Sequence, residues 1–183
     1  MREFLRAGHL PTLVVSLLHL ETSFMVWVLL GGLGVMIAGD LALSPAQKGV
    51  IVGIPLLGGA LARIPMGWLG DRFGAKRVGV LMLLFLTLPL AAGWLASPSF
   101  PELILVGLAL GVAGASFAVA LPLASRWYPA RYQGTALGIA AAGNSGSVFA
   151  NFLAPRLAAV VGWQGVLGAA LVPVLASVCF FAA

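Results

Sequence analysis

Long apolar stretches separated by short charged segments dominate the chain. No Asp, Glu, Lys or Arg occurs in residues 22–39, 78–101, 103–125, 132–155 or 157–183. Each stretch is near or above the roughly 18–20 residues that cross a bilayer as a helix. Residues 49–70 are also long enough, but Arg63 interrupts them. The pattern predicts an all-α membrane protein with six transmembrane helices, at about 12–38, 46–69, 78–97, 102–125, 133–160 and 163–183.

The composition supports this interpretation. Of the 183 residues, 61% are hydrophobic and only 8% are charged, and the mean hydropathy is +1.09. A soluble domain of this size cannot hide so much apolar surface, so lipid must solvate much of it. The net charge of +5 therefore indicates membrane topology, and no nucleic-acid partner is expected. Cys179 is the single cysteine, which excludes an intramolecular disulfide.

The positions of lysine and arginine predict the orientation of the chain. With the N-terminus inside, seven basic residues lie on the cytoplasmic side: Arg2, Arg6, Arg72, Lys76, Arg77, Arg126 and Arg131. Only Lys48 and Arg156 lie at the outer ends. This positive-inside bias predicts a multi-pass protein of the cell's inner (plasma) membrane with a cytoplasmic N-terminus. The basic start "MREFLRAGHL" is interpreted as leading into an uncleaved first span.

A short internal repeat indicates a transporter. "SPAQKGVIVGI" begins the second predicted helix and "YPARYQGTALGI" begins the fifth, and their paired glycines lie 85 residues apart. Three helices separate the two copies, and an odd number inverts the orientation, as in the inverted repeats of many transporters. Residues 1–183 are therefore predicted to form one six-helix bundle. Because the sixth helix ends in apolar residues, we expect the chain to be part of a longer protein.

Arg63 is the most informative residue of the second helix. A charged side chain near mid-bilayer costs about 2.5–3.5 kcal/mol on insertion scales. Its side chain leans toward the outer end of its helix, and therefore toward the midplane. Its planar fork of donors suits a flat oxyanion such as nitrate or a carboxylate. Two structural alternatives remain open, namely snorkelling to the surface and a salt bridge with Glu21 or Asp40.

The fifth helix carries two further patterns. Small residues recur every four positions and predict a packing face: Gly134, Gly138, Ala142, Gly146, Ala150 and Ala154. Nearly opposite lie Asn144, Ser147 and Asn151, which should face protein or water. Asn144 is expected roughly 15 Å from the inner edge, at a depth similar to that of Arg63. It serves either a shared site with Arg63 or an ordinary hydrogen bond between helices.

The segment "GWLGDRFGAKR" resembles the loop motif between helices two and three of the major facilitator superfamily. The resemblance implies the N-terminal six-helix bundle of such a transporter, with a 3+3 inverted repeat. In that family the loop belongs to the cytoplasmic gate. The positions that match the motif are Gly67, Asp71, Arg72, Gly74, Lys76 and Arg77.

Three more segments narrow the resemblance. "GALARIPMGW", "GVAGASFAVALPLASRWYP" and "QGTALGIAAAGNSG" are together similar to the nitrate/nitrite porter family. This implies that Arg63 coordinates the anion and that Asn144 contacts it. Phe117 either packs against the flat anion or serves the core. The glycine-rich nitrate signature of the family corresponds here to Gly138, Gly143, Asn144 and Gly146.

The prediction is therefore the N-terminal half of a nitrate/nitrite transporter that works by alternating access. Its expected partners are nitrate or nitrite, the lipid bilayer and a C-terminal six-helix half in the same or a separate chain. Family members have twelve helices and a second arginine, so this chain alone should not transport. Proton symport and anion exchange both remain open. His19 and Glu21 in the first helix could carry protons, because titratable groups in membranes often do. They are also expected near the inner interface, where solvated side chains need no special role.

Two other functions remain possible on the sequence. One is a facilitator for another small anion, such as a carboxylate, and the other is a transport-inactive membrane sensor or scaffold. An enzyme is not expected, because the sequence contains no metal-ligand cluster, no nucleophile paired with a base and no phosphate loop. No cofactor and no metal are predicted.

Overall fold

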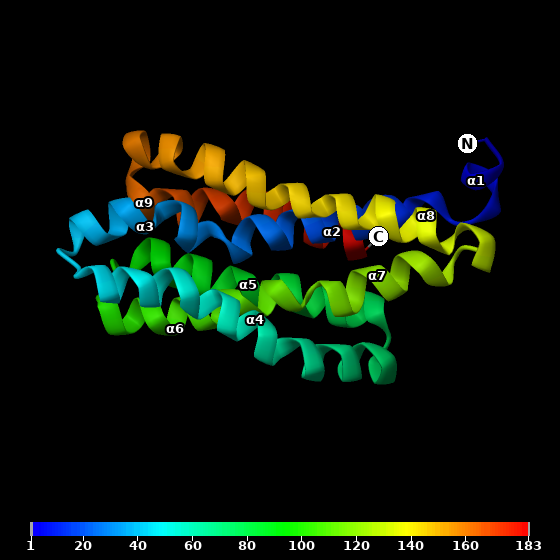
Figure 1. Ribbon diagram of the computed structural model, residues 1–183, viewed down its shortest axis with the longest axis horizontal. Coiled ribbons are helices and arrows are strands. Elements are labelled where there is room, and N and C mark those ends of the chain that lie inside the picture. Colours follow the sequence, from blue (N-terminus) through cyan, green and yellow to red (C-terminus); the bar gives the residue numbers. More distant parts are fainter. Residues whose placement is uncertain (1, 183) are drawn as a thin grey trace.

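The computed structural model describes residues 2–182, and these form an elongated bundle of helices with no strand in that range (Figure 1). The prediction of an all-α fold is thus confirmed. The elements are α1 (Arg2–Ala7), α2 (Leu10–Trp27), α3 (Leu29–Asp40), α4 (Pro45–Phe73), α5 (Ala75–Leu95), α6 (Phe100–Leu110), η1 (Gly111–Ala115), α7 (Phe117–Arg126), α8 (Ala130–Ala141), η2 (Ala142–Ser145) and α9 (Gly146–Ala182), where η marks a 3₁₀ helix.

The chain runs back and forth along the long axis of the bundle. Figure 1 shows the connections after α3 and α5 at one end, and those after α4 and α7 at the other, beside α1. The helix α9 contains one non-helical residue, Gly162, at φ 74° and ψ 163°. The chain turns back there, as the orange-to-red part of the ribbon shows. By length and composition, five helical segments of the described chain can cross a membrane, with residues 130–182 taken as one segment.

Local sequence chemistry explains where the helices begin. Ser44 caps α4, and its backbone N–H donates to the side chain of Gln47 at 2.9 Å while its hydroxyl accepts from the N–H of Gln47 at 3.3 Å. Ser99 precedes α6, and its backbone N–H and its hydroxyl both donate to the carboxylate of Glu102 at 2.7 Å. Gly74 separates α4 from α5 at φ 91°, a conformation that glycine adopts without steric cost.

Three of the membrane-length segments are interrupted rather than straight. Val28 adopts φ −98° and ψ 5° and divides α2 from α3. The 3₁₀ helices η1 and η2 divide α6 from α7 and α8 from α9. At η1 the backbones of two helices touch, because a Cβ added to Gly111 would lie 2.7 Å from the Cα of Gly58 on α4. These glycines therefore allow α4 and η1 to pack at close range.

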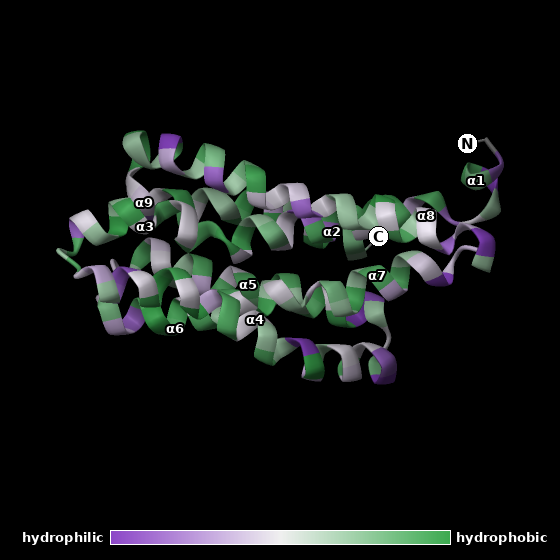
Figure 2. Cartoon of the chain, in the orientation of Figure 1, coloured by the Kyte–Doolittle hydropathy of each residue, from purple (hydrophilic) through white to green (hydrophobic). Residues whose placement is uncertain are grey.

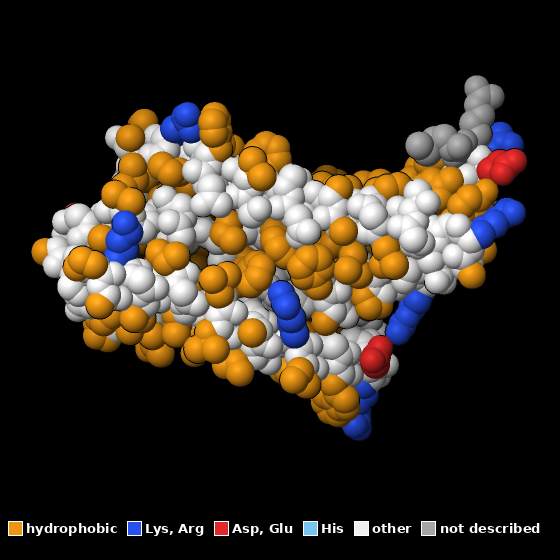
Figure 3. All heavy atoms as spheres, in the orientation of Figure 1, with side chains coloured by type: hydrophobic (Ala, Val, Ile, Leu, Met, Phe, Trp, Pro, Cys, Tyr) orange, Lys and Arg blue, Asp and Glu red, His pale blue; other side chains and the backbone are white. Residues whose placement is uncertain are grey.

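The interior and the open faces of the bundle differ in packing. The helices α2, α3 and α5 pack against α9, and their contact buries a continuous apolar core that includes Leu30, Leu33, Leu83 and Leu86. The surface is also largely apolar along the middle of the bundle, whereas polar residues concentrate toward the two ends (Figure 2). The view in Figure 3 shows Lys and Arg mainly toward the ends, with one basic side chain near mid-length. A lipid environment explains such a surface.

The small-residue face predicted for the fifth helix is only partly a packing face. Gly146, Ala150 and Ala154 are buried, whereas Gly134 and Gly138 are exposed, with open space where a Cβ would stand. The tighter winding of η2 lies between the two groups and changes the phase of the helix. The prediction of one continuous packing face is therefore wrong in this structure.

Candidate functional site

Arg63 lies on α4, ten residues before the last residue of the helix, or about 15 Å along its axis. Its Nε donates a hydrogen bond to the carbonyl oxygen of Gly114 at 3.3 Å. Its Cζ lies 5.8 Å from the ring centroids of both Trp27 and Phe117. The side chain is exposed, and its two terminal nitrogens have no hydrogen-bond partner within residues 2–182.

No acid neutralises this arginine in the described part of the chain. Glu21 instead accepts a hydrogen bond from the Ser145 hydroxyl at 2.7 Å. Asp40 accepts one from the indole of Trp163 at 2.9 Å. The salt-bridge alternative with Glu21 or Asp40 is therefore wrong in this structure. The guanidinium also bonds back to η1 in the middle of the bundle rather than reaching a helix end, which argues against snorkelling.

Aromatic rings form the wall behind the guanidinium. Phe24 packs edge-on against both Phe117 and Trp27, with centroids 4.9 Å and 5.1 Å apart. The Nε1–H of Trp27 donates to the carbonyl oxygen of Pro55 at 2.8 Å, which ties α2 to the helix that carries Arg63. The two arginine–aromatic contacts stabilise the cation without using its hydrogen-bond donors.

Trp27 was missed by the reasoning from sequence. The space that the Trp27 indole occupies depends on two glycines. A Cβ on Gly114 would lie 2.5 Å from the indole, and one on Gly59 would lie 2.9 Å from its Nε1. A signal was present, since a tryptophan in the middle of an apolar stretch needs an acceptor for its N–H group. What the sequence did not supply was the identity of that acceptor on another helix.

The predicted nitrate signature lies across α2 from this wall. Gly143 and Gly146 are buried against α2, where a Cβ on Gly143 would lie 2.6 Å from the carbonyl oxygen of Leu17, and one on Gly146 would clash with that of Glu21. Gly138 and Asn144 are exposed. Within residues 2–182 no hydrogen bond joins the Asn144 amide to Arg63, so the structure brings Arg63 and Phe117 together but leaves Asn144 apart from them.

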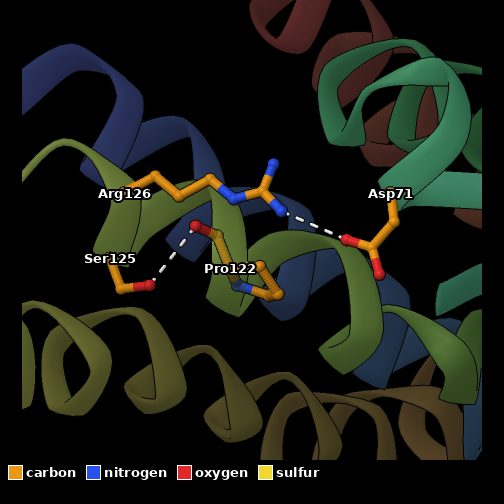
Figure 4. Close-up of polar contacts among 4 residues, drawn as sticks. All are labelled: Asp71, Pro122, Ser125 and Arg126. Carbon is orange, nitrogen blue, oxygen red and sulfur yellow. Dashed lines mark hydrogen bonds and ion pairs between the residues drawn. The ribbon is translucent and has the colours of Figure 1, made fainter.

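The loop motif lies between α4 and α5, and an ion pair joins it to the end of α7. Asp71 on α4 accepts a hydrogen bond from Arg126 on α7 at 3.1 Å, beside the bond from Ser125 to Pro122 (Figure 4). Both partners of this ion pair are exposed, at 78% for Asp71 and 58% for Arg126. The pair connects the end of α4 to the end of α7 at little energetic gain, because exposed ion pairs contribute between about 0 and 1 kcal/mol.

The other motif residues surround the turn from α4 to α5. Gly67 faces α7, where its Cβ would contact Ala118 at 3.7 Å. The guanidinium of Arg72 lies over the rings of Trp68 and Phe73, at 5.3 Å and 5.7 Å. The remaining motif residues are the turn glycine Gly74 and the exposed Lys76 and Arg77.

Comparisons with known proteins show the family to which the chain belongs. The family model described as the Major Facilitator Superfamily matches residues 15–183. The chain is 38% identical over 165 residues to a probable nitrate/nitrite antiporter, NarK1, of Thermus thermophilus, which covers 89% of this chain and 37% of that protein. It is 36% identical over 148 residues to a nitrite extrusion protein of Bacillus subtilis, covering 80% of this chain and 37% of the relative. The chain thus spans 37% of the length of these relatives.

Solved structures show the same fold at low sequence identity. The proton:xylose symporter XylE bound to 6-bromo-6-deoxy-D-glucose superposes with a TM-score of 0.79 at 13% identity, over 94% of this chain and 44% of that one. A bacterial homologue of the lysosomal transporter Spinster gives a TM-score of 0.70 at 17% identity, over 93% and 42% of the two chains.

Proposed function

Because the chain belongs to the Major Facilitator Superfamily, we propose that it is the N-terminal half of a nitrate/nitrite transporter in which Arg63 coordinates the anion. The similarity to nitrate and nitrite transporters that the helix motifs predicted is confirmed by two relatives at 36–38% identity. The chain is part of a multi-pass membrane protein of a transporter family. The substrate and the site residues are the parts that this proposal adds.

The geometry of Arg63 is the observation that carries the proposal. Gly114 occupies Nε, so the two terminal nitrogens remain as a pair of parallel donors. Such a pair matches two oxygens of a planar anion such as nitrate or nitrite. Phe117 offers a flat apolar surface beside the guanidinium. The buried Gly143 and Gly146 bring the Asn144 segment against α2, the helix that also carries Trp27.

The complete site requires more than this chain, because one arginine and one aromatic wall leave an anion open on one side. The relatives are longer, and we propose that a second six-helix half supplies the facing ligands. Rocking of the two halves would expose the anion alternately to each side. We also propose that the N-terminus and the α4–α5 turn lie in the cytoplasm, at the inner membrane, because the basic residues are concentrated at that end of the helices. The loop motif, with its Asp71–Arg126 pair, then belongs to the cytoplasmic gate.

Substitution of Arg63 tests the proposal in the complete protein that contains this chain. Arg63→Lys keeps the charge but removes the parallel donors, so the loss of charge-assisted hydrogen bonding should weaken nitrate affinity by about 10–100-fold. Uptake of labelled nitrate into proteoliposomes measures the effect. Arg156→Lys is the matched control, because Arg156 also contacts a ring and a backbone carbonyl but lies elsewhere, on α9. Equal uptake by both variants would contradict the proposal.

The same assay separates the alternative functions. Excess unlabelled nitrate or nitrite should block uptake, whereas formate and acetate should compete weakly. Stronger competition by the carboxylates would identify a facilitator for another small anion. A transport-inactive sensor or scaffold would show no uptake in the unsubstituted protein.

A further inference from the structure

Glu21 lies well inside the membrane-length helical segment at residues 10–40 rather than near its end. Glu21 is eleven residues from the start of α2, about 16 Å along the helix axis. It is half-buried, and its backbone is held against the glycine segment by Gly146. This position is farther from the end of the helical segment than the place near the inner interface that the sequence suggested. An acidic side chain at such a depth in a membrane protein requires a physical reason.

The hydrogen bonds around Glu21 suit both protonation states of the carboxyl group. The hydroxyl oxygen of Ser145 lies 2.7 Å from Oε2 of Glu21 and 2.8 Å from the carbonyl oxygen of Ala142. A hydroxyl group has one proton, so it donates to only one of these acceptors at a time. When Glu21 is ionised, Ser145 donates to it. When Glu21 is protonated, it donates to Ser145, and Ser145 donates to Ala142.

No positively charged side chain within residues 2–182 pairs with Glu21. The ionisable side chains on the main elements packed against α2 are Lys48, Arg63, Asp71 and Arg72 on α4, Arg126 on α7, Arg131 and Tyr132 on α8, Arg156 and Cys179 on α9, and Asp40 on α3. Within residues 2–182 none of them forms a hydrogen bond or ion pair with Glu21. On α2 itself, the buried His19 points to another partner, the carbonyl oxygen of Gly79 at 3.3 Å.

Glu21 lies on the same helix as Trp27, whose ring contacts Arg63. Its partner Ser145 follows Asn144 directly in the chain. On α2, Glu21 and Trp27 are six residues apart, about 9 Å along the helix, and the Trp27 ring lies 5.8 Å from the Cζ of Arg63. Like charges repel each other, and the repulsion is stronger where little water separates them. An ionised Glu21 therefore opposes a bound anion, and a protonated one does not.

We propose that Glu21, with Ser145 as its hydrogen-bond partner, is a proton-binding site that couples anion movement to proton movement. The inference rests on the proposed function of Arg63 as the anion ligand. By linkage, the anion and the proton each favour the binding of the other. In one cycle the Glu21 carboxylate takes a proton from water on one side of the membrane and returns it to water on the other. One O–H bond forms and breaks, and one proton accompanies one anion.

The experiment compares two transport modes of the complete protein in liposomes. The first is nitrate accumulation driven by a pH gradient, acidic outside, with the membrane potential clamped. The second is nitrate/nitrite counterflow without a gradient, which needs no net proton movement. Glu21→Gln keeps the shape of the side chain but cannot titrate. We expect it to lose gradient-driven accumulation, down to the level without a gradient, while counterflow stays within about threefold of the unsubstituted protein.

Matched variants make the result decisive. Glu102→Gln should leave both modes unchanged, because Glu102 is an exposed capping residue that Gln can replace. Glu21→Asp should keep gradient-driven accumulation. If Glu21→Gln also loses counterflow, the result for Glu21→Asp tests the proposal instead. Persistent accumulation in Glu21→Gln, or none in Glu21→Asp when its counterflow is intact, overturns the proposal. If the unsubstituted protein shows counterflow but no accumulation driven by the pH gradient, this inference alone is overturned, whereas absence of both modes overturns the proposed function.

Discussion

The segments at residues 45–73 and 100–126 are both apolar enough to cross a membrane, yet they are packed very differently. Only 22% of the residues are buried in the most apolar stretch of the first, compared with 61% in the second. The first carries Arg63, and the second supplies the Gly114 carbonyl and the Phe117 ring that hold it. The comparison teaches that the open helix presents the functional group while the buried helix fixes its position.

The contact between these two segments should be sensitive to a single methyl group. Gly111→Ala places a Cβ 2.7–2.8 Å from the backbone of Gly58 and Pro55, where no flexible side chain can move aside. Overpacking of this kind costs about 1–3 kcal/mol or more, so we expect the largest loss of stability here. Thermal unfolding of the complete protein in detergent measures it. The control is Gly53→Ala on α4, the helix that carries Gly58. A Cβ at Gly53 meets open space, so this variant should unfold at nearly the unsubstituted temperature. Equal effects would show that the close approach is not present in solution.

The aromatic wall should affect binding more than stability. Trp27→Phe removes the hydrogen bond to Pro55 and part of the ring surface beside Arg63, for a loss of about 1 kcal/mol. We expect the KM for nitrate to rise several-fold while the maximal rate changes less. Trp68→Phe alters another arginine–tryptophan contact on α4, that with Arg72, and should leave KM unchanged. A rise in KM for Trp68→Phe alone would place the anion elsewhere.

The ion pair of the loop motif should have the smallest effect on stability. Asp71→Asn breaks the contact with Arg126, and because both side chains are exposed, the loss should stay below about 1 kcal/mol. If the motif belongs to the gate, the transport rate should nonetheless fall. Unfolding temperature and initial transport rate, measured on the same preparation, separate the two effects. A large drop in unfolding temperature with normal transport would assign Asp71 a structural role.

The sequence predicted the class of fold because the distances between charges reflect the thickness of a bilayer. It did not predict the interruptions at Val28, η1 and η2, since glycine-rich apolar segments are compatible with both α and 3₁₀ winding. It also predicted one continuous small-residue face, which the phase change at η2 divides. Periodicity describes a single regular helix and cannot report such a change.

The candidate site was predictable only where the signal lay within the sequence of a single helix. Arg63 was conspicuous because a charge inside an apolar stretch is costly wherever its partner lies. The contact of Trp27 with Pro55 and that of Glu21 with Ser145 each join two helices whose residues are far apart in the sequence. Their existence depends on the rotation and register of one helix against another, which the pattern along a single helix does not determine. The roles of Asn144, Gly143 and Gly146 in anion binding remain predictions.

A structure of the complete protein with bound nitrate tests the central claim most directly. The account predicts a nitrate whose oxygens lie about 2.7–3.0 Å from the two terminal nitrogens of Arg63, with Nε still donating to Gly114 and the Phe117 ring beside the anion. An Arg63 side chain paired with a carboxylate, or directed toward lipid headgroups and away from the nitrate, would contradict it.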